Sequence, residues 1–186
     1  MIEALLSGGM KGMKVKKNRS FEKFWDYSET GYFNVGYPSD FNIDKTVLLV
    51  ENGTSNSSRS NANAVLRDYR DGADNVSFFH GYDQAYAYAK VTFVEIDKDV
   101  EHIVLPKDGY NYMSPVPEMV GRDPDKTLVL VKAFGPYFFS GGYDTGGPFA
   151  PVGYWSGSDY VVSRGLDASQ TGVSNDSDIL LQVISL

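Results

Sequence analysis

The stretch from Phe134 to Tyr160 constrains the fold more than any other part of the chain. Its 27 positions hold seven glycines, three prolines and nine aromatic residues, and its only charged side chains are Asp144 and Asp159. Glycine and proline are unfavourable inside a helix, so loops or short strands must carry most of these rings. That much aromatic surface has to be buried against the protein's own core, a neighbouring subunit or a ligand.

Seven segments have the hydrophobic pattern of β-strands. Those at 46–50 and 127–133 are apolar on both faces, which is typical of strands inside a sheet. The last segment, 179–185, is too apolar for a loose tail, so we expect it to pair inside a sheet of this subunit or of another. The other expected strands cover 76–80, 91–96, 101–105 and 160–163.

Three short helices are expected beside these strands. The first begins after Ser20, a favourable N-cap, and places Phe21, Phe24 and Trp25 on one face. The other two are expected over 61–70 and 82–90. The sequence therefore predicts a strand-dominated α+β fold: a single domain with a mixed or antiparallel sheet, about three short helices and long irregular loops.

Charge is distributed unevenly along the chain. Residues 20–186 carry 12 basic and 23 acidic side chains, a net charge of −11, so this body is unsuited to broad contact with nucleic-acid phosphates. We interpret 1–19 as a flexible basic N-terminal arm and 20–186 as one globular β-rich domain. The arm is either a solvated tail or a contact for an acidic partner, such as another copy of the body. Its basic residues are Lys11, Lys14, Lys16, Lys17 and Arg19.

The sequence shows neither a familiar export signal nor a membrane-spanning segment. The apolar run at 2–6 is too short for a signal peptide and precedes the basic residues. No segment approaches the roughly 18 apolar residues of a membrane helix. We therefore expect a soluble protein without membrane contact, located in the cytoplasm or forming part of a virion.

Motifs for catalysis, metals and cofactors are missing from the sequence. The chain has no cysteine, and its two histidines, His80 and His102, lack the spacing of metal ligands. It also has no phosphate-binding loop and no nucleophile elbow. We therefore expect no catalytic residue, no metal and no cofactor.

One short segment resembles the NAD-binding core of ADP-ribosyltransferases. Phe78-Phe79-His80-Gly81 is followed by a segment rich in tyrosine and alanine, where a helix is expected. The resemblance implies a pocket centred on His80, in which the imidazole orients a ribose and a glutamate stabilises the transition state. No glutamate follows Glu118, so Glu95 or Glu101 would have to supply this carboxylate.

The aromatic stretch and the basic arm together favour a structural role. We expect a non-enzymatic subunit of a larger assembly, such as a phage capsid, cement, connector or tail component, which binds copies of itself or other subunits. A glycan-binding module acting through the loop 137–160 is the alternative, and an ADP-ribosyltransferase-like enzyme centred on His80 is a second one. The expected interface or ligand-binding residues are Tyr137, Tyr143, Asp144, Phe149, Tyr154, Trp155 and Asp159.

Overall fold

The structure is a computed structural model that describes residues 13–54, 65–71, 75–81, 84–106, 114–134, 152–163 and 178–186. Within these ranges the chain forms twelve β-strands and three 3-10 turns. The strands are β1 (Val15–Trp25), β2 (Gly31–Gly36), β3 (Thr46–Thr54), β4 (Val65–Asp71), β5 (Asn75–His80), β6 (Ala87–Ile96), β7 (Glu101–Leu105), β8 (Ser114–Pro115), β9 (Thr127–Phe134), β10 (Val152–Ser156), β11 (Asp159–Ser163) and β12 (Asp178–Ser185). The turns are η1 (Ile43–Lys45), η3 (Pro117–Met119) and η4 (Pro124–Lys126).

The predicted dominance of strands is confirmed, but the α+β class with about three short helices is wrong, because the helical segments of the described residues are single 3-10 turns. The expected helix after Ser20 is part of β1, and the expected helices at 61–70 and 82–90 overlap β4 and β6. The error has a simple origin. A spacing of four residues is even, so Phe21 and Trp25 share one face in a strand as well as in a helix.

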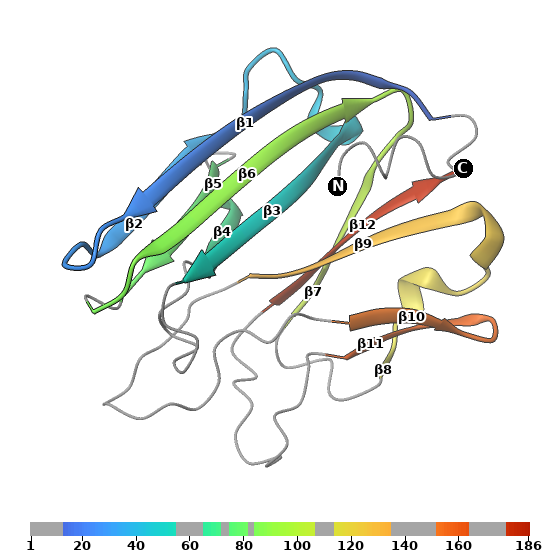
Figure 1. Ribbon diagram of the computed structural model, residues 1–186. Helices are drawn as coiled ribbons and strands as arrows, with labels where there is room; N and C mark the ends of the chain where they lie inside the picture. Colours follow the sequence, from blue (N-terminus) through green and yellow to red (C-terminus); the bar gives the residue numbers. More distant parts are fainter. Residues whose placement is uncertain are drawn as a thin grey trace.

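The strands form four antiparallel sheets of three strands each. Sheet A has the order β1-β6-β3, sheet B has β2-β5-β4, sheet C has β7-β12-β9 and sheet D has β10-β11-β8. Figure 1 shows sheet A in front of sheet B at the left of the molecule, with sheet C to the right of them and sheet D below sheet C. In the described ranges, no helix is long and apolar enough to cross a membrane.

Two apolar clusters hold these sheets together in pairs. Between sheets A and B, Trp25, Leu48 and Phe93 meet Val76 and Phe78 of β5. Between sheets C and D, one face of β12 packs on η3 and β11, with Leu105, Met119, Val162, Ile179 and Leu181 at the centre. We call the first pair the A/B sandwich.

Sheet C also meets sheet A, and it does so at the edge strand β3. Leu180 belongs to the core of the A/B sandwich, whereas Ile184 packs with Val47 and Val94 from the opposite face of sheet A. Gln182 lies between these two residues on the same face of β12. The edge of sheet A therefore rests on the face of sheet C, with a buried amide at the crossing.

Candidate functional site

Three pairs of aromatic rings surround one end of the A/B sandwich, at the lower left of Figure 1. The pairs are Phe24–Tyr88, Tyr27–Tyr86 and Tyr32–Phe79, with ring centroids 4.8, 5.8 and 4.8 Å apart. We call these six residues the aromatic collar. Four of them are largely open to solvent: Phe24 is 65% exposed, Tyr86 55%, Tyr27 53% and Tyr32 51%.

Alternation along the strands explains why these rings face outward. In β1, Trp25 fills the core of the sandwich, so the preceding Phe24 points to the other face. In β2, Phe33 packs against Trp25 and Phe78, and Tyr32 is outside. The collar therefore covers the outer face of sheet A, the tip between β1 and β2, and the outer face of sheet B.

Carboxylates lie beside the collar on sheet A. Glu22 and Glu51 both occupy positions opposite Lys90 in the register of the sheet, next to the pair formed by Phe24 and Tyr88. Burial, and then the negative charges of Glu51 and Glu22, raise the pKa of Tyr88. Asp26 and Glu29 lie at this end as well, together with the two lysines Lys23 and Lys90, so carboxylates outnumber lysines beside the exposed rings.

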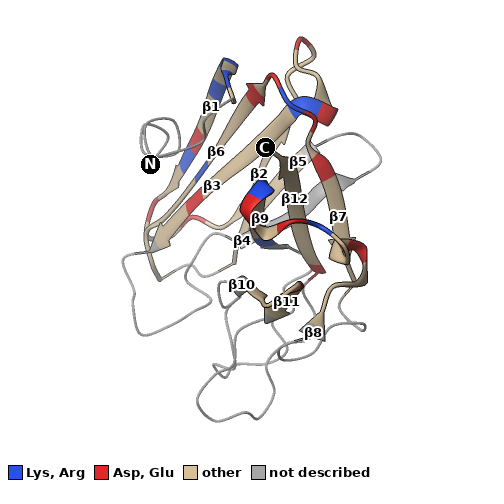
Figure 2. Ribbon diagram, turned by 90° about the vertical axis from the view of Figure 1, so that its right-hand side faces the viewer, with Lys and Arg blue, Asp and Glu red and all other residues tan. Residues whose placement is uncertain are grey.

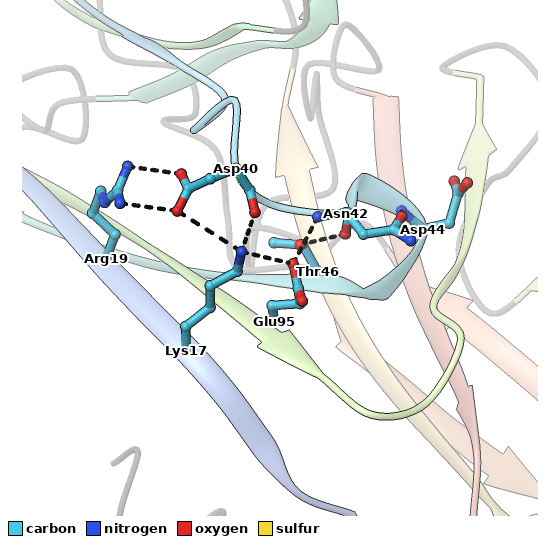
Figure 3. A network of polar contacts seen from close by, with 7 residues as sticks. All are labelled: Lys17, Arg19, Asp40, Asn42, Asp44, Thr46 and Glu95. Carbon is cyan, nitrogen blue, oxygen red and sulfur yellow. Dashed lines mark hydrogen bonds and ion pairs between the residues drawn. The ribbon is translucent and has the colours of Figure 1, made fainter.

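The basic residues at the other end of β1 have a different environment, shown in Figure 3. Arg19 binds the carboxylate of Asp40 through two hydrogen bonds of 3.1 and 3.2 Å. Lys17 donates to the carbonyl oxygen of Asp40, and its Nζ lies 3.5 Å from the carboxylate of Glu95. The carboxylate of Glu95 also accepts a 2.7 Å hydrogen bond from the backbone N–H of Asn42.

This network fastens the connection between β2 and β3 to sheet A. The ring of Phe41 lies under Lys17, with Nζ 4.6 Å from the ring centroid, and packs edge-on against Phe93. Partial desolvation opposes ionisation of Asp40, but a hydrogen bond from its own backbone N–H and the charges of Arg19 and Lys17 outweigh it and lower its pKa. Two basic residues of the expected arm therefore bind acidic groups of their own chain.

The other basic residues of this segment are placed differently. Lys14 and Lys16 are exposed, and Lys16 lies at a β-bulge in the pairing of β1 with β6. The backbone N–H of Lys14 donates to Asp97 at 2.7 Å, and this bond is the main cause of the lowered pKa of Asp97. Lys11 lies outside the described residues.

Part of the expected aromatic site lies on the hairpin β10–β11. Trp155 packs edge-on against the buried Tyr160, with centroids 5.1 Å apart, and both belong to the core between sheets C and D. Tyr154 and Asp159 are exposed on the outer side of the hairpin. Burial raises the pKa of Tyr160 to about 12. The other expected site residues, Tyr137, Tyr143, Asp144 and Phe149, lie outside the described residues.

His80, the centre of the proposed ADP-ribosyltransferase likeness, is fully buried beside Trp25, with ring centroids 5.7 Å apart. Trp25 pairs with Ala87 at the start of β6, whereas Glu95 lies eight residues further along the same strand, about 26 Å away. Glu101 is bound by Arg122 at 2.5 Å. The structure therefore does not bring Glu95 to His80.

A second polar group is buried where sheet C meets β3. The amide of Gln182 is fully buried and lies 2.9 Å from the Nε2 atom of His102. Lys132 donates to the amide oxygen at 2.8 Å, and burial lowers the pKa of this lysine to about 7. In the sequence, the signal for this site is a single glutamine inside the apolar segment 179–185.

The described residues contain no group of three or more histidine, aspartate or glutamate side chains that could hold a metal ion. A comparison with protein-family models finds no matching family, and comparisons with curated proteins and with solved structures find no significant match.

Proposed function

We propose that this protein is a non-enzymatic structural subunit of a larger assembly, and that the aromatic collar is its contact with a neighbouring protein subunit. The observation that carries the proposal is the gathering of four rings, each more than half exposed, at one end of the A/B sandwich. Tyrosine and phenylalanine are enriched at the centres of protein interfaces because they bury large areas with little loss of side-chain freedom.

The shape of the collar favours a protein partner over a sugar. Its ring pairs lie on the outer faces of two sheets and on the tip between them, so the surface is convex. A sugar ring covers only one such pair, whereas a protein surface is large enough to cover all three. In its most concrete form the proposal is a virion component such as a capsid, cement, connector or tail subunit, bound to copies of itself or to other subunits.

The proposal is tested by replacing exposed collar residues and measuring association by sedimentation velocity over a wide range of concentration. We expect Phe24→Ser combined with Tyr27→Ser to weaken association at least about tenfold. Val120→Ser is the matched control, because Val120 is also strongly exposed but lies away from the collar. Circular dichroism of each variant checks that the fold is kept.

Two results would contradict the proposal. One is a collar variant that associates as strongly as the unchanged protein. The other is a protein that stays monomeric, binds no protein subunit and instead binds a neutral oligosaccharide through the collar, which would favour a glycan-binding module.

A further inference from the structure

The strand β1 connects a basic end of the molecule with an end that carries exposed aromatic rings and carboxylates. It begins beside Lys14 and Lys16 and ends beside Phe24, at the aromatic collar. Its 11 residues separate these ends by about 33 Å. Figure 2 shows basic residues gathered at the upper end of β1, and one acidic and one further basic residue, Glu22 and Lys23, follow along the strand.

We call Lys14, Lys16, Lys17 and Arg19, at the start of β1, the basic end. Only some of these residues are paired with carboxylates of the same chain. Asp40 and Glu95 bind Lys17 and Arg19, as described above. Lys14 and Lys16 are exposed and form no ion pair within 4 Å of a described carboxylate, although the charge of Lys14 contributes to lowering the pKa of Asp97. Because β1 is an edge strand among the described sheets, the backbone on its outer side can also approach another chain. The start of β1 therefore presents two ammonium groups outward.

The collar offers the complementary surface. Its rings can hold a cation over their faces, and Glu22, Asp26 and Glu51 lie near it without an ion pair among the described residues. The chain already makes a contact of this kind internally, where Lys17 lies over the ring of Phe41 between Asp40 and Glu95. Rings flanked by carboxylates are thus a lysine-binding arrangement that this sequence is able to build.

We infer that the collar of one copy receives the basic start of β1 from a second copy, so that copies of this chain join head to tail. This inference rests on the proposed function and names the partner of the same surface. The collar meeting another collar would place carboxylates against carboxylates in a protein whose body carries a net charge of −11. The head-to-tail contact instead pairs unlike charges. It leaves one free collar and one free basic end, and so produces rings or filaments.

The inference is tested with two variants. Neither should self-associate alone, but each should bind the other when they are mixed. The basic-end variant is Lys14→Glu with Lys16→Glu, and the collar variant is Tyr27→Ser with Tyr86→Ser. Each should be monomeric alone. Their equimolar mixture should form 1:1 dimers. These dimers grow no further, because the one intact collar and the one intact basic end meet in the contact and only the two altered surfaces stay free. The matched control, Arg122→Glu with Lys126→Glu, makes the same charge change beside the turns η3 and η4 and should associate like the unchanged protein.

The outcomes separate this inference from the proposed function. Association should weaken roughly tenfold or more between low and high salt, because the contact is electrostatic. A mixture that stays monomeric while the unchanged protein self-associates would overturn the head-to-tail contact and leave the structural role in place. A collar that binds only a different kind of subunit would likewise overturn the head-to-tail contact and leave the structural role in place. Self-association that persists in the collar variant would overturn both.

Discussion

The side-chain amide of Gln182 takes the place of a neighbouring strand beside Leu48. Its oxygen accepts a 2.9 Å hydrogen bond from the backbone N–H of Leu48, and its nitrogen donates to the carbonyl oxygen of Thr46 at 3.2 Å. These two backbone groups point out of the same edge of β3, which has no strand partner on that side within the described sheets. Gln182 thereby satisfies a buried sheet edge and joins sheet C to sheet A.

The polarity of the β3 backbone fixes the orientation of this amide. Because Leu48 must donate and Thr46 must accept, the oxygen and the nitrogen of Gln182 cannot exchange places. The amide nitrogen also lies 2.9 Å from Nε2 of His102, so this ring nitrogen has to accept. His102 therefore carries its proton on Nδ1 in the assembled junction.

We expect Gln182→Leu to destabilise the protein by about 2–6 kcal/mol. The leucine fills a similar volume but leaves the Leu48 N–H and the Thr46 carbonyl buried without partners, and each unsatisfied group costs about 1–3 kcal/mol. Chemical denaturation monitored by tryptophan fluorescence measures the change. Gln84→Leu, at an exposed position, is the control, and equal stability of the two variants would show that the amide bridge contributes nothing.

Lys132→Met should stabilise the protein and reduce the pH dependence of its stability. Burial lowers the pKa of Lys132 from 10.5 to about 7, so between these values the unfolded chain binds more protons than the folded one. The free energy of unfolding therefore rises as the pH increases from about 7 to 10.5. The total effect is at most about 5 kcal/mol, and less to the extent that water reaches this half-buried side chain.

The measurement is a series of unfolding curves across this pH range. The methionine variant should lose the rise and be more stable than the unchanged protein by about 1–3 kcal/mol at neutral pH. Lys126→Met is the control, because the side chain of Lys126 is well exposed. An unchanged slope in Lys132→Met would show that the amine is not the titrating group.

The strands with apolar residues on both faces could be predicted from the sequence. The segments expected at 46–50, 127–133 and 179–185 correspond to β3, β9 and β12. Each of them lies between two layers of the molecule, which is why apolar residues occupy both faces. The last segment is the central strand of sheet C in this same subunit.

The helices and the collar could not be predicted, for different reasons. Alternation in β6 buries Ala87, Ala89 and Val91. Alanine and tyrosine are also compatible with a helix, so the composition of 82–90 favoured a helix where a strand forms. The collar pairs Tyr27 with Tyr86 and Tyr32 with Phe79, and these residues meet only once the sheets have formed. Such pairs leave no local signal in the sequence.

Glu95→Gln should loosen the attachment of the segment between β2 and β3. The carboxylate is buried, accepts from the Asn42 N–H and faces Lys17, so a neutral amide removes the charge partner of a half-buried lysine. We expect a loss of about 1–3 kcal/mol and faster amide hydrogen exchange in residues 37–45. Glu51→Gln, at an exposed position, is the control, and similar exchange in both variants would argue against the role given to Glu95.

Gly153→Ala should destabilise the hairpin β10–β11, because Tyr160 lies across the face of this glycine. An added Cβ would clash with the hydroxyl oxygen of Tyr160 and would lie 2.8 Å from both its Cζ atom and Cγ2 of Val131. We expect a cost of about 1–3 kcal/mol, typical of overpacking. Tyr160→Phe removes the nearest clashing atom, so in a double-mutant cycle the two changes together should cost less than the sum of the single changes. Strict additivity would show that the tyrosine is not what excludes a side chain at position 153.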